Sequence, residues 1–295
     1  MAAGDSKRVV IAALLANLGI AAAKGVAAVF TGSGAMLAET IHSLADSGNQ
    51  ALLLLGIHRA GRPPDAKHPF GYGSERYFWA FIVAVVLFAL GSLFSLFEGV
   101  HKLLHQEPLQ QAGWAYGVLL VALVLEAMSF RVAQVGVRRI RGSRRFFHYF
   151  FESKDPALPL VYLEDLGALL GLGLALLGVA ASHLLGWTWA DGAATLAIGL
   201  LLGAIAVVLL VRCHHLLVGE SATPQDVAAV RAAAAGVDGI SEVVDLKTLQ
   251  IGPEYLLVCL EVRIAGENEE RDVRAVERAV RAAVPSAKYV SIEPV

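Results

Sequence analysis

Residues 190–211 read ADGAATLAIGLLLGAIAVVLLV, and Asp191 is the only charged residue among them. A helix rises about 1.5 Å per residue, so a stretch of this length crosses the roughly 30 Å hydrocarbon core of a bilayer. Five more apolar stretches of similar length precede it, at residues 9–30, 35–57, 78–100, 114–137 and 160–182. The first is too long for the apolar region of a signal peptide, so we expect it to be retained. The sequence therefore predicts an all-α transmembrane domain of six helices.

The composition of the chain agrees with a membrane location. Of its 295 residues, 56% are hydrophobic and 17% are charged, against about 45–50% and about 25% in an average soluble domain. The formal net charge of -2 offers no basic excess for a nucleic-acid partner. The two cysteines, Cys213 and Cys259, make neither a disulfide framework nor a CxxC metal motif. We expect an integral, multi-pass membrane protein that does not bind nucleic acid.

Positive charge is distributed very unequally between the two sides of the predicted bundle. One side carries only Lys102. The other side carries Lys7, Arg8, Arg59, Arg62, Lys67, Arg76, Arg138, Arg139, Arg141, Arg144, Arg145, Lys154 and Arg212. Because lysine and arginine near helix ends stay in the cytoplasm, this asymmetry predicts that both termini are cytoplasmic. We expect the membrane to be a bacterial inner membrane.

The apolar pattern stops near residue 220, which divides the chain into a transmembrane domain of residues 1–219 and a cytoplasmic domain of residues 220–295. Thr223, Pro224 and Asp226 form a helix-start signal before an alanine-rich helix that runs to Ala235. Residues 243–250 and 255–264 alternate as two strands, a second amphipathic helix follows at 270–283, and a last strand lies at 288–293. The order α-β-β-α-β predicts a small, ferredoxin-like or metallochaperone-like α/β sandwich.

Ionisable residues inside the second apolar stretch indicate a functional site. Glu39, His42 and Asp46 lie within a narrow arc of one helix face, and each is costly to insert into a membrane, at about 2.5–3.5 kcal/mol for a charged residue. His42 and Asp46 are one turn apart, so an imidazole nitrogen and a carboxylate oxygen reach the same divalent ion. Glu39 is about 10 Å from Asp46 along the axis, too far to share that ion without a break in the helix.

The fifth stretch contributes Glu164 and Asp165 at a depth that matches Asp46. Adjacent helical residues diverge by about 100°, so one of the two acids faces a shared site while the other faces a neighbouring helix or lipid. The alternative is that these groups are buried structural pairs, for instance Lys24 with an acid of the second helix. For Glu126, alone in the fourth stretch, we favour structural pairing over a role as a proton relay.

Two motifs give the chain a family resemblance. Residues 36–50 read MLAETIHSLADSGNQ and residues 62–76 read RPPDAKHPFGYGSER. Together with Asp191 at the start of the last span and the α-β-β-α-β domain, they resemble the cation diffusion facilitator family of divalent-metal transporters, over essentially the whole chain. The resemblance implies a homodimeric metal–proton antiporter, with no enzymatic activity and no resident cofactor, which dimerises through its cytoplasmic domain. It also implies two ligands from helix two and two from helix five, and makes His42, Asp46 and Asp165 ligands.

The helix-five motif departs from the family pattern. The position four residues before Asp165 is Val161, which cannot bind a metal. We expect Glu164 to be the fourth ligand, while Glu39 or a water molecule are the alternatives. The Glu-Asp pair resembles the branch of the family that includes the mitochondrial zinc exporters of eukaryotes.

The other metal sites of the family that this sequence resembles lack some of their usual ligands here. In the loop after helix two, Asp65 and His68 match an accessory site, but Tyr72 replaces its third ligand, so we favour a structural turn that contacts the neighbouring domain. All nine histidines lie at or before His215, which leaves none for the cytoplasmic domain. Cys259 alternates with apolar strand residues and is expected to be a small core residue.

The chemistry of the predicted site indicates how transport is coupled. A neutral imidazole and ionised carboxylates bind Zn²⁺, and also Co²⁺, Ni²⁺, Fe²⁺ or Mn²⁺, whereas protonation of the same groups expels the metal. Two other classes remain as alternatives: a membrane-embedded hydrolase and a non-transporting membrane scaffold. The sequence has no HExxH, GxSxG or GxxxxGK motif, which counts against the hydrolase. Metal binding by the purified protein before and after His42→Ala separates these readings.

Overall fold

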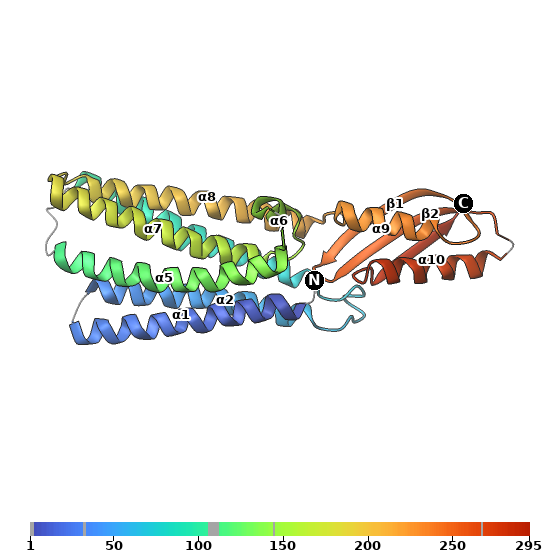
Figure 1. Ribbon diagram of the computed structural model, residues 1–295, viewed down its shortest axis with the longest axis horizontal. Coiled ribbons are helices and arrows are strands. Elements are labelled where there is room, and N and C mark those ends of the chain that lie inside the picture. The colour runs from blue at the N-terminus through green and yellow to red at the C-terminus, as the bar shows by residue number, and fades with distance from the viewer. Residues whose placement is uncertain (1–2, 32–33, 106–111, 144, 267) are drawn as a thin grey trace.

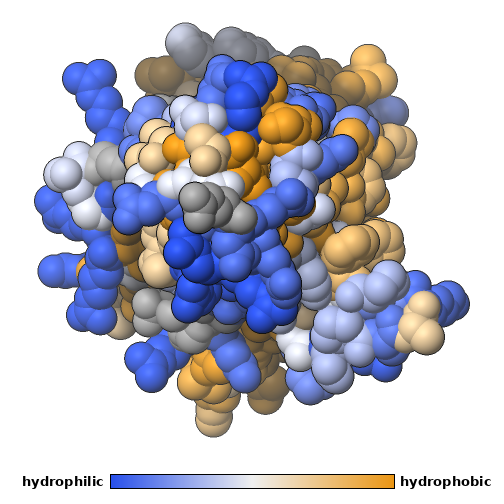
Figure 2. All heavy atoms as spheres, turned by 90° about the vertical axis from the view of Figure 1, so that its right-hand side faces the viewer, coloured by the Kyte–Doolittle hydropathy of each residue, from blue (hydrophilic) through white to orange (hydrophobic). Residues whose placement is uncertain are grey.

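The computed structural model describes residues 3–31, 34–105, 112–143, 145–266 and 268–295. It consists of a long helical bundle with a small α/β domain at one end (Figure 1). The N-terminal end of the first helix lies at the same end of the bundle as the α/β domain. Seen from the α/β domain, polar side chains gather over the near part and hydrophobic side chains appear along the edges (Figure 2). This separation is that of a membrane-embedded bundle attached to a water-exposed domain.

The bundle is built almost entirely from long helices. Their bounds are α1 Ala3–Thr31, α2 Gly34–Ala60, α3 Glu75–Val86, η1 Leu87–Leu93, α4 Phe94–Leu104, α5 Ala112–Arg141, α6 Phe146–Glu152, α7 Ala157–Leu185 and α8 Ala190–Val218. Within the described part of the chain, five stretches are long and apolar enough to cross a membrane. These stretches are Ser6–Val26, Glu75–Leu104, Ala115–Arg141, Ala157–Leu185 and Ala190–Val218. The stretch Glu75–Leu104 joins α3, the π-helical segment η1 and α4 into one rod.

Helix α2 is the predicted span that is not among these five stretches, because it is less apolar than they are. It is 27 residues long and packs along α1 and α3, so it is a full member of the bundle. Its polar side chains at Ser43, Ser47, Asn49 and Gln50 are buried, which means that they face other helices rather than lipid. The sixth crossing therefore stays a prediction, because α2 combines sufficient length with a polar inner face.

The α/β domain has the predicted α-β-β-α-β order. Its elements are α9 Pro224–Ala235, β1 Ile240–Gly252, β2 Tyr255–Ile264, α10 Glu269–Ala283 and β3 Tyr289–Pro294. The sheet order is β1-β2-β3, with β1 and β2 antiparallel and β2 and β3 parallel. The Thr223 side chain caps α9 by accepting a hydrogen bond from the backbone N–H of Asp226, as the helix-start signal predicts.

One face of the sheet is covered by helices and the other is open. Val258 and Leu260 of β2 are buried in a core that includes Val276 and Val280 of α10. Because side chains alternate along a strand, Cys259 between them points to the opposite face, where it is exposed. The expectation that Cys259 is a core residue is therefore wrong.

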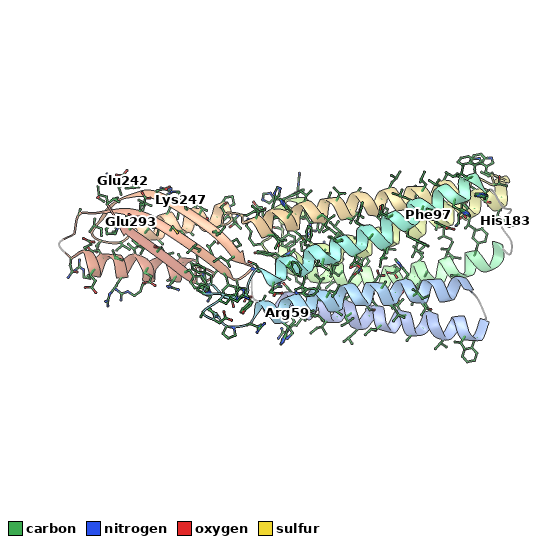
Figure 3. All side chains as sticks on the ribbon, turned by 180° about the vertical axis from the view of Figure 1, so that it is seen from behind. Arg59, Phe97, His183, Glu242, Lys247 and Glu293 are labelled. Atoms are coloured by element: carbon green, nitrogen blue, oxygen red, sulfur yellow. The ribbon has the colours of Figure 1, made fainter. Side chains whose placement is uncertain are left out.

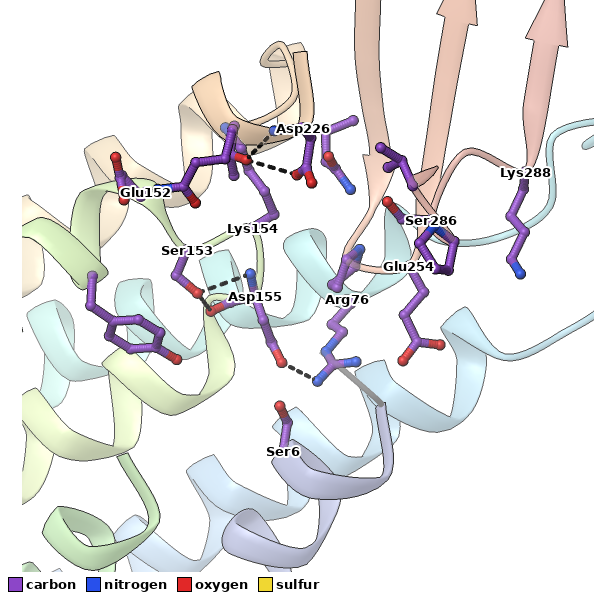
Figure 4. A pocket seen from close by; sticks show the side chains of 17 residues that line it. Ser6, Arg76, Glu152, Ser153, Lys154, Asp155, Asp226, Glu254, Ser286 and Lys288 are labelled. Atoms are coloured by element: carbon purple, nitrogen blue, oxygen red, sulfur yellow. Dashed lines mark hydrogen bonds and ion pairs between the residues drawn. The ribbon is translucent and has the colours of Figure 1, made fainter. Parts of the chain in front are cut away.

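Ion pairs and hydrogen bonds join the bundle to the α/β domain. Glu220, in the segment after α8, forms ion pairs with Lys154 at 2.7 Å and with Arg212 of α8. Its backbone carbonyl accepts a hydrogen bond of 2.8 Å from Gln250 of β1. A cavity of about 740 Å³ lies beside this junction, and Arg76 and Asp155 form an ion pair of 2.5 Å in its wall (Figure 4). These contacts hold the segment that leads from α8 into the α/β domain against the end of the bundle.

Candidate functional site

Helices α1, α2, α5 and α7 pack against one another and enclose a polar interior. Within it, buried polar side chains come from all four helices. They are Asn17, Lys24, Ser43, Asp46, Ser47, Asn49, Gln50, Glu126, Ser129, Glu164 and Asp165. Polar groups cost free energy in a hydrocarbon environment, so a set of this size inside a bundle marks the part of the molecule where function is most expected.

The α2 residues His42 and Asp46 lie as their spacing predicts. The His42 Nε2 atom is 3.6 Å from Asp46 Oδ2, across one helical turn. Half of the His42 side chain is exposed, whereas only 11% of the Asp46 side chain is. The imidazole therefore lies at the edge of the polar interior and the carboxylate lies inside it.

Both acids of α7 face the interior. Glu164 and Asp165 are 4% and 3% exposed. Glu164 Oε1 accepts a hydrogen bond of 2.6 Å from Asn49 Nδ2 of α2, whereas Asp165 Oδ2 lies 3.3 Å from the Ser129 hydroxyl of α5. The sequence analysis expected one of these acids to face the shared site and the other to face a neighbouring helix or lipid. In the structure, neither acid faces lipid. The adjacent acids contact different helices, in agreement with their angular separation.

The structure brings the α2 and α7 carboxylates near one another without forming a closed ligand set. Asp46 is close enough to interact electrostatically with Glu164 and Asp165. Among the residues whose side chains are described, no three of His, Cys, Asp or Glu are arranged to hold one metal ion. Glu39 belongs to α2, but its side chain falls outside the described residues. The predicted ligands are therefore neighbours rather than a preformed tetrahedron.

Lys24 and Glu126 form a buried ion pair beside these carboxylates. The Lys24 Nζ atom lies 3.4 Å from Glu126 Oε1 and donates a hydrogen bond of 2.9 Å to the Ser43 hydroxyl. Structural pairing of Glu126 is thus confirmed, because Lys24 of α1 pairs with this acid of α5. Because a buried charge without a partner is strongly destabilising, this pair ties α1, α2 and α5 together.

Asn49 and Ser129 lie beside the candidate site, and the sequence analysis did not identify them. Each contacts one α7 carboxylate, and Ser129 also lies 2.9 Å from Asn17 Oδ1 of α1. The sequence contains a signal for Asn49, since it follows His42 by two turns and Asp46 by one and so shares their face of the helix. Ser129 carries a similar signal, because it follows Glu126 by about one turn of the same helix.

The loop between α2 and α3 uses Asp65 and His68 to shape a turn. Asp65 accepts hydrogen bonds from the Tyr72 hydroxyl at 2.6 Å and from the His68 backbone N–H at 2.7 Å. These two hydrogen bonds hold the pKa of Asp65 below its ordinary value. Phe70, in the same loop, packs edge-on against Tyr289 of β3 with ring centroids 5.1 Å apart. The loop thus forms the expected turn and contacts the neighbouring domain, while the accessory metal site at Asp65 and His68 stays an untested alternative.

Known proteins similar to this chain are transporters. Residues 10–218 match the cation efflux transmembrane domain. The chain is 33% identical over 289 residues to the mitochondrial proton-coupled zinc antiporter SLC30A9 of Xenopus laevis, covering 94% of this chain and 51% of the relative. It is 31% identical over 264 residues to metal tolerance protein C4 of Arabidopsis thaliana, with 89% of this chain and 58% of the relative covered.

A more distant relative is the magnetosome protein MamM of Magnetospirillum gryphiswaldense, which is 26% identical over 259 residues, 86% of this chain and 75% of that one. The chain spans about half the length of the SLC30A9 antiporters that it matches. The family model covers most of the chain, and its extent coincides with the helical bundle. The chain therefore belongs to the cation efflux family of membrane transporters.

Proposed function

We propose that this protein is a secondary transporter that exports divalent transition-metal cations, foremost Zn²⁺, from the cytoplasm in exchange for protons. The observation that carries this proposal is the burial of Asp46, Glu164 and Asp165 within electrostatic range of one another inside a bundle of apolar helices. Carboxylates at that depth are costly unless a cation or protons compensate them. The names of the SLC30A9 relatives, proton-coupled zinc antiporters, support Zn²⁺ and protons as the pair of substrates.

We assign His42, Asp46 and Asp165 as ligands and Glu164 as the fourth ligand. One imidazole with two or three carboxylates suits Zn²⁺, while Co²⁺, Ni²⁺, Fe²⁺ and Mn²⁺ are weaker candidates. Because the ligands come from two helices, a small movement of α2 against α7 brings them together or separates them, which is the basis of alternating access in transporters. Glu39 then serves the access path or proton transfer.

The coupling to protons follows from the ligand chemistry. A metal ion binds to deprotonated carboxylates and neutral imidazole, and protons that bind the same groups displace it. Metal and protons thus compete for one site, and each cycle exchanges one for the other across the membrane. No other substrate or resident cofactor is needed.

We also propose a homodimer with both termini in the cytoplasm, in a bacterial inner membrane. The distribution of lysine and arginine supports this orientation. Cys259 is a native probe, because it is exposed on the α/β domain whereas Cys213 is buried. A membrane-impermeant maleimide is expected to label Cys259 in inverted vesicles and not in intact cells, and the reverse result would refute the orientation. Cross-linking that captured only monomers would count against the dimer.

Transport by the purified chain in proteoliposomes tests the function directly. An imposed proton gradient is expected to drive Zn²⁺ uptake, and Co²⁺, Ni²⁺, Fe²⁺ and Mn²⁺ measured in parallel give the selectivity. Asp46→Asn and Asp165→Asn should abolish uptake, because the remaining groups cannot complete the coordination of the ion. His183→Ala is the matched control, since His183 lies on α7 near the end of the bundle farthest from the α/β domain (Figure 3). A rate of Zn²⁺ uptake that did not change with the proton gradient would contradict antiport.

A further inference from the structure

A groove runs between α1 and α5 at the end of the bundle nearest the α/β domain. Its volume is about 630 Å³, and its lining includes Val9 and Ala12 of α1 and Met128, Val132 and Val135 of α5. Figure 1 shows the start of α1 and the end of α5 at this end of the bundle. The groove has its own lining residues and shares none with the carboxylates of the proposed transport site.

Three arginines give the groove its charge. Arg8 of α1 and Arg131 and Arg139 of α5 line it, and no acidic side chain does. All three are exposed, and within the described part of the chain none of their side chains has a hydrogen bond, an ion pair or a ring contact. Other arginines at this end of the bundle are engaged, for example Arg76 with Asp155 and Arg212 with Glu220. The groove therefore has an excess of positive charge that the described protein leaves uncompensated.

Arg131 lies deeper in the membrane than the other two. It belongs to the membrane-crossing stretch Ala115–Arg141 and follows Ser129, whose hydroxyl contacts Asp165 in the interior, by two residues. An exposed guanidinium at this depth is costly in hydrocarbon unless it reaches an anion. An arginine side chain is long enough to carry its charged group along an apolar surface toward the membrane boundary, where lipid phosphates lie.

The walls of the groove suit a hydrocarbon chain. They are apolar between the arginines, and the absence of a side chain at Gly136 lets α1 approach α5 closely, because a Cβ there would lie 2.7 Å from Val9 Cγ2. A substituted residue at Gly136 would push the two helices apart. The groove thus combines an apolar floor with a cationic rim.

We infer that this groove binds one anionic glycerophospholipid from the leaflet on the side of the α/β domain. The lipid phosphate lies between Arg8, Arg131 and Arg139, and an acyl chain lies along Met128, Val132 and Val135. Guanidinium groups bind phosphate through paired, charge-assisted hydrogen bonds, which favours an anionic over a zwitterionic headgroup. This site is independent of which metal is transported.

Native mass spectrometry of the full-length protein in neutral detergent tests the inference. The protein is titrated with phosphatidylglycerol and with phosphatidylcholine of the same acyl chains, and the retained lipid is counted. We expect preferential retention of phosphatidylglycerol. Arg131→Gln should weaken that binding about fivefold, as expected for one arginine at a lipid surface, whereas Arg131→Lys should keep most of it. Arg139→Gln should give a similar loss if Arg131→Gln fails to fold.

Arg138→Gln is the matched control, because Arg138 is an exposed arginine of the same helix that does not line the groove. Equal effects of Arg131→Gln and Arg138→Gln, or equal retention of the two lipids, would overturn the site. Displacement of the lipid by excess inorganic phosphate would overturn the role of the acyl chain. If Arg131→Gln dissociated dimers in lipid-free detergent, the groove would be an interface with a second copy, and the lipid assignment would be wrong.

Discussion

The side-chain amide of Asn49 on α2 donates a hydrogen bond of 2.6 Å to Oε1 of Glu164 on α7. Asn49 follows Asp46 by one helical turn, and Glu164 directly precedes Asp165, so the contact joins the two helices beside the proposed ligands. Glu164 Oε2 is buried and has no hydrogen-bond partner among the described residues. The amide thus fixes one carboxylate oxygen and leaves the other available to a cation.

The first prediction is that Asn49→Ala raises the KM for Zn²⁺ transport by about tenfold, because hydrogen bonds to charged groups are worth about 1.5–3 kcal/mol. The variant leaves the Glu164 carboxylate free to rotate away from the ion. Gln50→Ala is the control, since Gln50 is equally buried on the same helix and its side-chain amide has no hydrogen bond to a described residue. Similar KM values for the two variants would mean that the Asn49 amide does not position the Glu164 carboxylate for the ion.

The second prediction concerns ion selectivity. His42→Asp replaces the imidazole with a carboxylate and leaves an all-oxygen site, which favours harder cations. We expect transport of Zn²⁺ to fall relative to Mn²⁺ in competition assays with both ions. Because half of the His42 side chain is exposed, the substitution should not unfold the protein. An unchanged ratio of Zn²⁺ to Mn²⁺ transport would remove His42 from the ligand set.

The third prediction identifies the fourth ligand. Glu164→Gln should weaken Zn²⁺ binding, measured by calorimetry on the purified protein, by at least about tenfold, because an amide is a poorer ligand for Zn²⁺ than a carboxylate. Glu39→Gln should slow transport while leaving the binding constant nearly unchanged. If the Glu164→Gln variant transported Zn²⁺ normally and the Glu39→Gln variant did not bind Zn²⁺, the fourth ligand would be Glu39 of α2. Helix α2 would then have to be distorted to bring Glu39 to the ion.

The fourth prediction is a pH dependence at the junction of the two domains. Burial opposes ionisation of Glu220, but the hydrogen bonds from Lys154 and Arg212 outweigh it and hold the pKa of Glu220 below its ordinary value of 4.5. A lowered pKa in the folded state means that the stabilisation is complete above about pH 4.5 and is lost as the pH falls through the folded-state pKa. Glu220→Gln should therefore lower the thermal unfolding midpoint at pH 7, and this effect should shrink as the pH falls below about 4.5.

Glu242→Gln serves as the control for the junction. Glu242 pairs with Arg263 on the sheet, and both side chains are more than half exposed, so the loss of this pair should be nearly neutral. Equal destabilisation by the two variants would show that the Glu220 ion pairs contribute no more than a surface pair does.

The fifth prediction is that residues 221–295 alone bind no Zn²⁺ with sub-micromolar affinity. They contain no histidine and a single thiol, Cys259. A row of carboxylates crosses the sheet at Asp245, Glu261 and Glu293, and Lys247 Nζ already lies 2.8 Å from Asp245. Carboxylates alone are poor Zn²⁺ ligands. A tight, stoichiometric calorimetric isotherm would restore a metal-sensing role for this domain.

The sequence by itself determined the elements and the location of the polar interior. Apolar stretches of about 20 residues can only be buried as membrane-length helices, and alternation with period two defined β1 and β2. The one-turn spacing of His42 and Asp46 brought those side chains together, because helix geometry alone fixes that distance. The short helix α6 was not predicted, since its seven aromatic-rich residues are too few to show a period.

Only the tertiary structure decided which partner each buried polar group has. Sequence spacing gives the angle between Glu164 and Asp165, but not the rotation of α7 that turns one toward Asn49 and the other toward Ser129. In the same way, Lys24 reaches Glu126 on α5 because of how α1 packs, which no periodicity within α1 encodes. Local spacing is set by the covalent chain and the helix repeat, whereas the rotation and neighbours of each helix depend on packing against all the others.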